Sequence, residues 1–107
     1  MLITFIITKT PQEESFNNFL KLLNLYLGRE EVFIYLIGNG VYGALHGHIH
    51  ADLIHTLAQQ YEVHAFKGDL KARGLLEKNL IEEIKLFDNY DDFVEFIMEK
   101  TDQIFSF

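Results

Sequence analysis

Three histidines alternate with other residues in the segment Leu45-His46-Gly47-His48-Ile49-His50. In an extended chain all three imidazoles would lie on one face and could ligate Zn²⁺ or Ni²⁺, and in a helix His46 and His50 would still share a face. No cysteine accompanies them, and only Asp52 and His55 are near in sequence as further ligands. We interpret the triplet as a polar, partly exposed loop before a helix, keep a metal site as the alternative, and predict no cofactor.

Asp69 and Arg73 are four residues apart in Gly68-Asp69-Leu70-Lys71-Ala72-Arg73-Gly74. This segment predicts a single helical turn with an acidic residue near its start and a glycine at its end. An ion pair at this spacing supports a helical turn by about a few tenths of a kcal/mol. The planar guanidinium of Arg73 could also bind an anion or a carboxylate of a partner. Both residues are therefore candidates for binding as well as for local structure.

An apolar run, Val32-Phe33-Ile34-Tyr35-Leu36-Ile37, is followed by Gly38-Asn39-Gly40 and by a second apolar stretch. The run predicts a strand covered on both faces, the glycines predict a sharp turn, and the second stretch predicts the start of a helix. Ligands and partners bind open parallel sheets at the carboxyl ends of the strands, so the functional edge is predicted near residues 38–46. The candidate contact residues at this edge are Asn39, Gly40, Tyr42 and Leu45.

The residues of this edge favour contact with a protein partner over phosphate binding. The glycine turn lacks the lysine of a P-loop and the complete dinucleotide fingerprint, so a tight turn explains it better than a phosphate loop. Tyr42 is the best interface candidate, because aromatic residues are enriched at the cores of protein interfaces. The edge is therefore predicted to contact a partner.

Side chains that would carry enzymatic chemistry are missing or have a structural explanation. The chain contains no cysteine, which excludes a thiol nucleophile and thiolate metal ligands. It contains neither a nucleophile-elbow motif nor a recognisable Ser-His-Asp triad motif. Asp88, Asp91 and Asp92 precede a predicted helix, where carboxylates cap the end and offset the helix dipole. We predict that the chain is not an enzyme, and a hydrolase that uses His or Asp at this edge is the last of the hypotheses.

Alternating strands and helices must position these residues. Apolar and β-branched runs predict strands near residues 2–8, 32–37, 62–66, 84–87 and 103–107, and amphipathic segments predict helices near residues 14–27, 51–60 and 90–100. Gly28 is the expected residue beyond the first helix. This alternation predicts a parallel sheet with right-handed crossovers and with helices on both faces.

Length and composition fit one compact domain. The chain has 107 residues, of which 49% are hydrophobic, and ten of them are phenylalanine. Its net charge of −7 argues against direct binding of nucleic acid, which needs basic residues for phosphate contacts. No segment approaches the roughly 20 apolar residues of a membrane span, and the N-terminal stretch lacks the basic region of a signal peptide. We therefore expect a cytoplasmic protein with no membrane partner.

Three blocks of the sequence resemble the small DsrH/TusB subunits of the DsrE-like sulfur-relay proteins. Asn39-Gly40-Val41-Tyr42-Gly43-Ala44-Leu45 is similar to the family's Asp-Gly-(Val/Ile)-x-Ala-(Ala/Leu), with Asn in place of Asp. The stretch at residues 63–75 resembles a short strand followed by Asp-Leu-x-Ala-Arg-Gly, the most specific segment of the three. Residues 88–94 resemble Asp-Tyr-x-Asp-Phe-Val, with Asn89 as an extra residue. The blocks follow the family's order over nearly the whole chain.

This resemblance implies a DsrE-like three-layer α/β/α fold with a five-stranded, mainly parallel sheet. It also implies assembly with two sister subunits into a heterohexamer that serves 2-thiolation of the tRNA wobble uridine or dissimilatory sulfur oxidation. Sister subunits carry the active cysteine in this family, and some DsrH members add one in the first helix, which would fall at Phe19 here. The implied role is a non-catalytic subunit whose partners are DsrE/DsrF-like (TusD/TusC-like) subunits.

A second hypothesis is a stand-alone homo-oligomer of this fold that binds a small ligand or metal at the 38–50 edge. A neighbouring reading frame for a cysteine-bearing DsrE-like protein would favour the first hypothesis over the second. Under both hypotheses the chain is not a monomer. Apolar side chains around Tyr42, Leu45 and Ile49 are expected to form a surface patch, with Arg73 near the rim of the contact.

Overall fold

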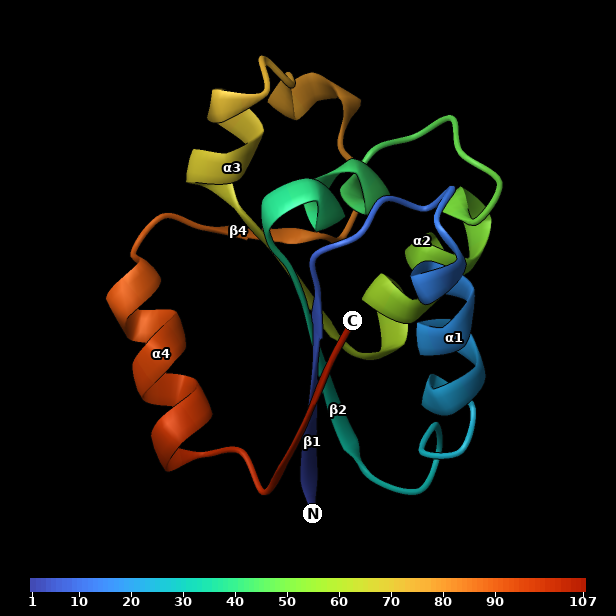
Figure 1. The fold of residues 1–107 in the computed structure, drawn as a ribbon, viewed down its shortest axis with the longest axis vertical. Helices are drawn as coiled ribbons and strands as arrows, with labels where there is room; N and C mark the ends of the chain where they lie inside the picture. Colours follow the sequence, from blue (N-terminus) through green and yellow to red (C-terminus); the bar gives the residue numbers. More distant parts are fainter.

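A computed structural model describes all 107 residues and contains one five-stranded sheet (Figure 1). The strand order is β4-β3-β2-β1-β5, and every neighbouring pair is parallel. The elements in chain order are β1 (Leu2–Ile7), α1 (Glu14–Leu23), β2 (Glu31–Leu36), the 3₁₀ helix η1 (Gly38–Ala44), α2 (Ala51–Gln60), β3 (Glu62–Phe66), α3 (Lys67–Ala72), the 3₁₀ helix η2 (Glu77–Asn79), β4 (Lys85–Phe87), α4 (Tyr90–Glu99) and β5 (Gln103–Ser106). The predicted fold class is confirmed.

The helices form two layers around the sheet. Helices α1 and α2 cover one face and α4 covers the other, while η1 and α3 lie across the carboxyl ends of the strands (Figure 1). The chain builds the sheet from β1 to β4 in one direction and then returns over the opposite face, through α4, to β5. Right-handed crossovers require this change of face when the direction of strand addition reverses.

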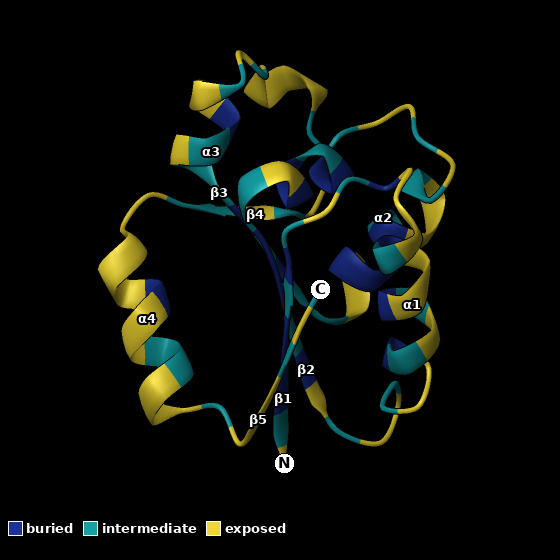
Figure 2. Ribbon diagram, viewed as in Figure 1, coloured by how far each residue is buried: buried dark blue, intermediate teal, exposed yellow.

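The main core lies between the sheet and the α1–α2 layer, where Figure 2 shows the buried segments gathered. Strand residues point alternately to the two faces, so Phe5 points into this core. Its ring packs edge-on against Phe19 of α1 at 5.5 Å between centroids, and Phe19 packs on Phe16 at the same distance. The α4 layer contributes less to the core, because Phe93 is the only buried residue of that helix.

The first helix is shorter than predicted. It ends at Leu23 rather than at residue 27, and the next turns are closed by hydrogen bonds from Leu25 N–H to the Leu22 carbonyl and from Tyr26 N–H to the Leu23 carbonyl. These three-residue spacings wind the chain more tightly than an α-helix. The ring of Tyr26 then packs on Phe5, at 6.2 Å between centroids.

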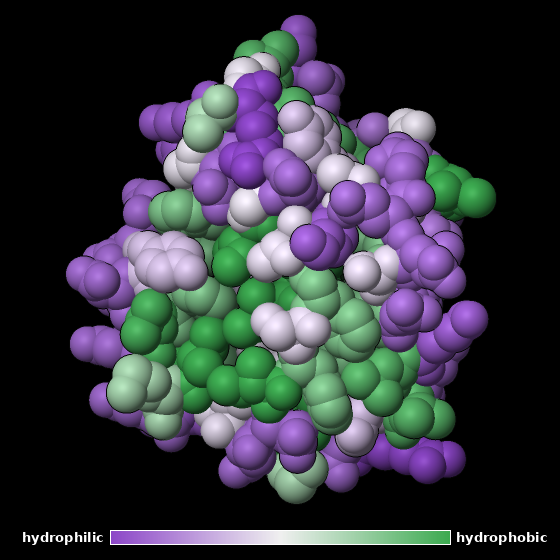
Figure 3. Space-filling model, viewed as in Figure 1, coloured by the Kyte–Doolittle hydropathy of each residue, from purple (hydrophilic) through white to green (hydrophobic).

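The surface carries apolar area around the β5 edge of the sheet. Figure 3 shows hydrophobic side chains gathered in the lower half of this view, where β5 and the C-terminus lie in front. Exposed apolar residues of α4 and β5 include Val94, Met98 and Ile104. None of the helices is long or apolar enough to cross a membrane.

Candidate functional site at the carboxyl edge of the sheet

The glycine segment after β2 forms the 3₁₀ helix η1, not the sharp turn and separate helix that the sequence indicated. Gly38 starts it with a φ of +54°, and the Gly40 N–H donates to the Ile37 carbonyl at 2.8 Å. Gly40 lies directly on the end of β1: a Cβ at this position would be 2.0 Å from the carbonyl oxygen of Ile7. Only glycine allows this close approach, which brings η1 against the carboxyl end of the sheet.

Three of the predicted site residues meet where η1 touches α3. The Asp69 carboxylate accepts a hydrogen bond from the Gly38 N–H at 2.7 Å. The Arg73 guanidinium donates from Nε to Asn39 Oδ1 at 3.1 Å and from Nη1 to the carbonyl oxygen of Asp69 at 3.0 Å. Its Nη1 also lies 3.5 Å from Asp69 Oδ1, which forms the predicted i, i+4 ion pair. The two segments are thus joined through polar side chains.

In this arrangement Arg73 keeps N–H donors that can bind another molecule. A guanidinium carries five N–H donors, and the bonds to Asn39 and Asp69 occupy two of them. The side chain is 24% exposed, so its remaining donors can reach a molecule at this edge. Such a held guanidinium suits a carboxylate or another planar anion.

The apolar candidates of this edge are less exposed than expected. Tyr42 and Leu45 are half-buried, and Ile49 is 84% exposed. Leu45, just after η1, forms an isolated antiparallel bridge with Leu80. Of the three residues of the predicted patch, Ile49 alone is exposed. The larger apolar area of the surface lies at the β5 edge.

The three histidines do not converge. The ring of His48 is held by its own loop, with Nε2 3.0 Å from the Gly43 carbonyl oxygen and Nδ1 accepting from the His50 N–H at 3.1 Å. Burial lowers the pKa of His48 below its ordinary value, against the opposing effect of the Gly43 carbonyl. The His50 ring stacks on Phe16 at 5.4 Å, while His46 is exposed. The fold contains no group of three or more His, Cys, Asp or Glu residues arranged to hold a metal ion.

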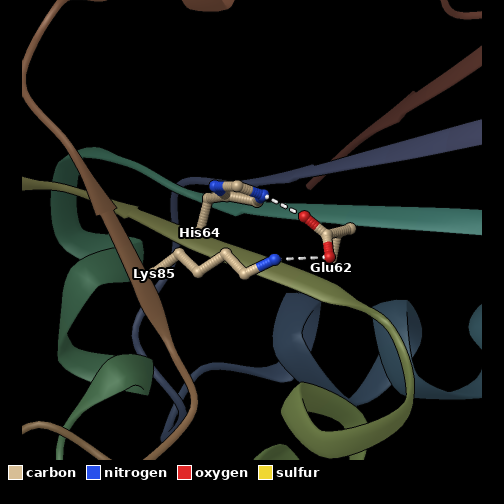
Figure 4. Close-up of polar contacts among 3 residues, drawn as sticks. All are labelled: Glu62, His64 and Lys85. Carbon is tan, nitrogen blue, oxygen red and sulfur yellow. Dashed lines mark hydrogen bonds and ion pairs between the residues drawn. The ribbon is translucent and has the colours of Figure 1, made fainter.

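The structure also forms a polar network that the sequence analysis did not identify, on the α4 face of the sheet (Figure 4). Glu62 and His64 of β3 point to the same face, with His64 Nε2 3.1 Å from Glu62 Oε1. Lys85 of β4 donates to Glu62 Oε2 at 2.6 Å. The hydrogen bond from Lys85 lowers the pKa of Glu62, so the carboxylate is ionised at neutral pH.

The histidine of this network is neutral at neutral pH. Burial lowers the pKa of His64, and this effect exceeds the opposing attraction of Glu62. Because ionised Glu62 can only accept a hydrogen bond, the proton of the imidazole resides on Nε2 and Nδ1 is left as an acceptor. The alternation of Glu62 and His64 was visible in the sequence, but the approach of Lys85 depends on the register that pairs it with His64.

Solved structures share this fold. A protein of unknown function from Methanobacterium thermoautotrophicum has a TM-score of 0.77 at 20% identity, with 98% of this chain and 97% of that chain covered. The YchN protein from E. coli has a TM-score of 0.78 at 18% identity, with 99% and 97% covered. At these identities the likeness concerns the fold.

Sequence comparison gives the family. No curated protein matches the chain significantly. The family model of the DsrH-like proteins matches residues 10–103, which include η1, α3 and α4. The expected resemblance is therefore confirmed: the chain belongs to the DsrH-like family, whose members work in sulfur-relay complexes with other subunits.

Proposed function

We propose that the chain is a non-catalytic subunit of a DsrEFH/TusBCD-like sulfur-relay complex that serves tRNA wobble-uridine 2-thiolation or sulfur oxidation. The observation that carries this proposal is the match to the DsrH-like family over residues 10–103 of a chain without cysteine. Without a thiol the chain has no group on which to carry a persulfide. Its contribution to the relay is then the surface that it offers to DsrE/DsrF-like subunits that do carry the sulfur.

The edge formed by η1 and α3 is the proposed contact surface. The hydrogen bonds of Asn39 and Asp69 fix the Arg73 side chain before a partner arrives, so little conformational entropy is lost when its free donors bind a partner carboxylate. Tyr42 lies half-buried three residues after Asn39 on η1 and supplies an aromatic surface on the 3₁₀ helix to which Arg73 is bonded. Tyrosine and arginine are both enriched among the residues that contribute most of the binding energy of an interface.

Replacing Tyr42 with aspartate tests this surface. If Tyr42 is buried in the contact, the new carboxylate is left unpaired there, and binding of a cysteine-bearing DsrE-like partner is expected to weaken by about 30-fold or more. The measurement is light scattering with isothermal titration of the partner into wild type and variant. Because Tyr42 is not fully buried in the isolated chain, circular dichroism of the variant should match that of the wild type.

Ile104→Asp is the matched control for this experiment. It places the same charge on the apolar area at the β5 edge, where Ile104 is 42% exposed. The proposal expects unchanged partner binding for Ile104→Asp. Loss of binding in that variant with normal binding in Tyr42→Asp would move the contact to β5 and refute the assigned surface.

A further inference from the structure

A cavity lies between the sheet and α4, on the face of the sheet opposite α1 and α2. Its volume is about 250 Å³, just below the range of roughly 300–1,000 Å³ that sites for drug-sized ligands occupy. Tyr35 of β2 and His64 of β3 come from neighbouring strands and pair directly in the sheet register. The cavity is lined by Tyr35, His64, Phe87, Asp88, Asn89, Asp92, Phe93 and Phe96.

Aromatic rings form most of its walls and hold one another in place. The Tyr35 ring lies 4.7 Å from Phe93 and 5.8 Å from Phe96, between centroids, and packs edge-on against Phe87 at 5.7 Å. The His64 ring stacks on Tyr35 at 5.1 Å. These contacts hold the aromatic walls of the cavity in place before any ligand binds.

The Tyr35 hydroxyl is a polar group without a protein partner in this cavity. The residue is only 6% exposed, and none of the side-chain hydrogen bonds of the fold involves its hydroxyl. No fully buried side-chain oxygen lacks a partner, so this hydroxyl must retain contact with open space, and the space that Tyr35 lines is the cavity. Burial raises the pKa of Tyr35 to about 12, which keeps the hydroxyl neutral at neutral pH. The hydroxyl is therefore free to form a hydrogen bond with a ligand that enters the cavity.

The remaining polar groups are mainly acceptors. Asp88 and Asp92 are exposed carboxylates of the lining, and His64 has Nδ1 as an acceptor because its Nε2–H faces Glu62. No lysine or arginine lines the cavity. The amino end of α4 would attract an anion, but Asp91 and Asp92 in its first turn offset that charge, and the Asp91 N–H already donates to Asn89.

We propose that this cavity is a binding site for a small organic cation that carries a guanidinium or alkylammonium group. Cations of this kind bind favourably over aromatic faces, and their N–H groups match the carboxylates and the His64 acceptor. The volume accommodates such a head group with a short carbon chain. The site lies on the opposite face of the sheet from α1 and α2 and does not depend on the sulfur-relay role.

Titration with butylguanidinium, followed by two-dimensional NMR, tests the site. Saturable shifts are expected for the backbone amides of β2, β3 and the 87–93 segment. Butylurea, a neutral molecule of nearly the same shape, is expected to bind at least tenfold more weakly, because it lacks the charge. Asp92→Asn and Tyr35→Phe are each expected to weaken butylguanidinium binding by about threefold to tenfold.

Asp91→Asn is the matched control. It removes the same charge from the same helical turn, but Asp91 does not line the cavity, so the dissociation constant should stay within twofold of the wild-type value. Three results would each overturn the proposal: shifts that never saturate, equal binding of butylurea, or an Asp91→Asn effect as large as that of Asp92→Asn. Because Asp92 is exposed, Asp92→Asn is expected to fold normally, and circular dichroism checks this.

Discussion

Replacing Gly40 with alanine is expected to remove most of the stability of the protein. The added Cβ would lie 2.0 Å from the carbonyl oxygen and 2.7 Å from the carbonyl carbon of Ile7, and both atoms belong to the backbone of strand β1, which is paired on both sides. No side-chain rotation relieves such a clash. The carbonyl of Ile7 also accepts from the Ile37 N–H at 3.0 Å, so moving η1 away would disturb the junction of β1 and β2. We expect a loss of roughly 4 kcal/mol or more, which is a large part of a typical domain's stability.

Gly38→Ala provides the matched comparison. Gly38 has a φ of +54°, and a Cβ there would meet no atom within 4 Å. Its substitution therefore adds only backbone strain of about 1–2 kcal/mol. Urea unfolding of the two variants, followed by circular dichroism, measures the difference. If Gly40→Ala were as stable as Gly38→Ala or more stable, this result would contradict the close approach of η1 to β1.

Replacing Phe19 with cysteine is expected to damage the core without creating a sulfur carrier. Phe19 is the position at which the family resemblance places the cysteine of some DsrH members, and in this fold it is fully buried. Its ring contacts Phe5, Phe16 and Phe107 with centroids 5.5–6.0 Å apart. Removing the ring leaves a cavity and should cost about 2–4 kcal/mol. A thiol in apolar surroundings also has a raised pKa and low reactivity.

The variant is measured by urea unfolding and by the rate at which a thiol reagent labels it under native conditions. We expect a labelling rate far below that of Leu25→Cys, a control position that is 60% exposed. Rapid labelling of Phe19→Cys in a stably folded protein would show that α1 opens at this position, contrary to the packing described here.

The fold was predictable from the sequence because its signals are local. The run Val32–Ile37 is apolar at every position, which is typical of a strand covered on both faces, and β2 is indeed the central strand. The ion pair of Asp69 and Arg73 follows from their spacing on one helical turn. Such features need no knowledge of distant parts of the chain.

Other features depend on contacts between distant segments. Leu45 forms a bridge with the distant Leu80, and the aromatic cavity requires Tyr35 and His64 to meet residues of α4. The local glycine pattern reveals neither the 3₁₀ geometry of η1 nor the close approach of Gly40 to β1. These interactions are fixed by strand register and layer packing, so periodicity alone could not predict them.

Native mass spectrometry of the chain with a persulfidated, cysteine-bearing DsrE-like partner tests the central claim most directly. The account predicts a stable complex in which the additional sulfur atom stays on the partner, because this chain has no thiol to accept it. Absence of any complex at micromolar concentrations, or the mass of one added sulfur atom on this chain, would contradict the proposed role as a non-catalytic subunit of a sulfur relay.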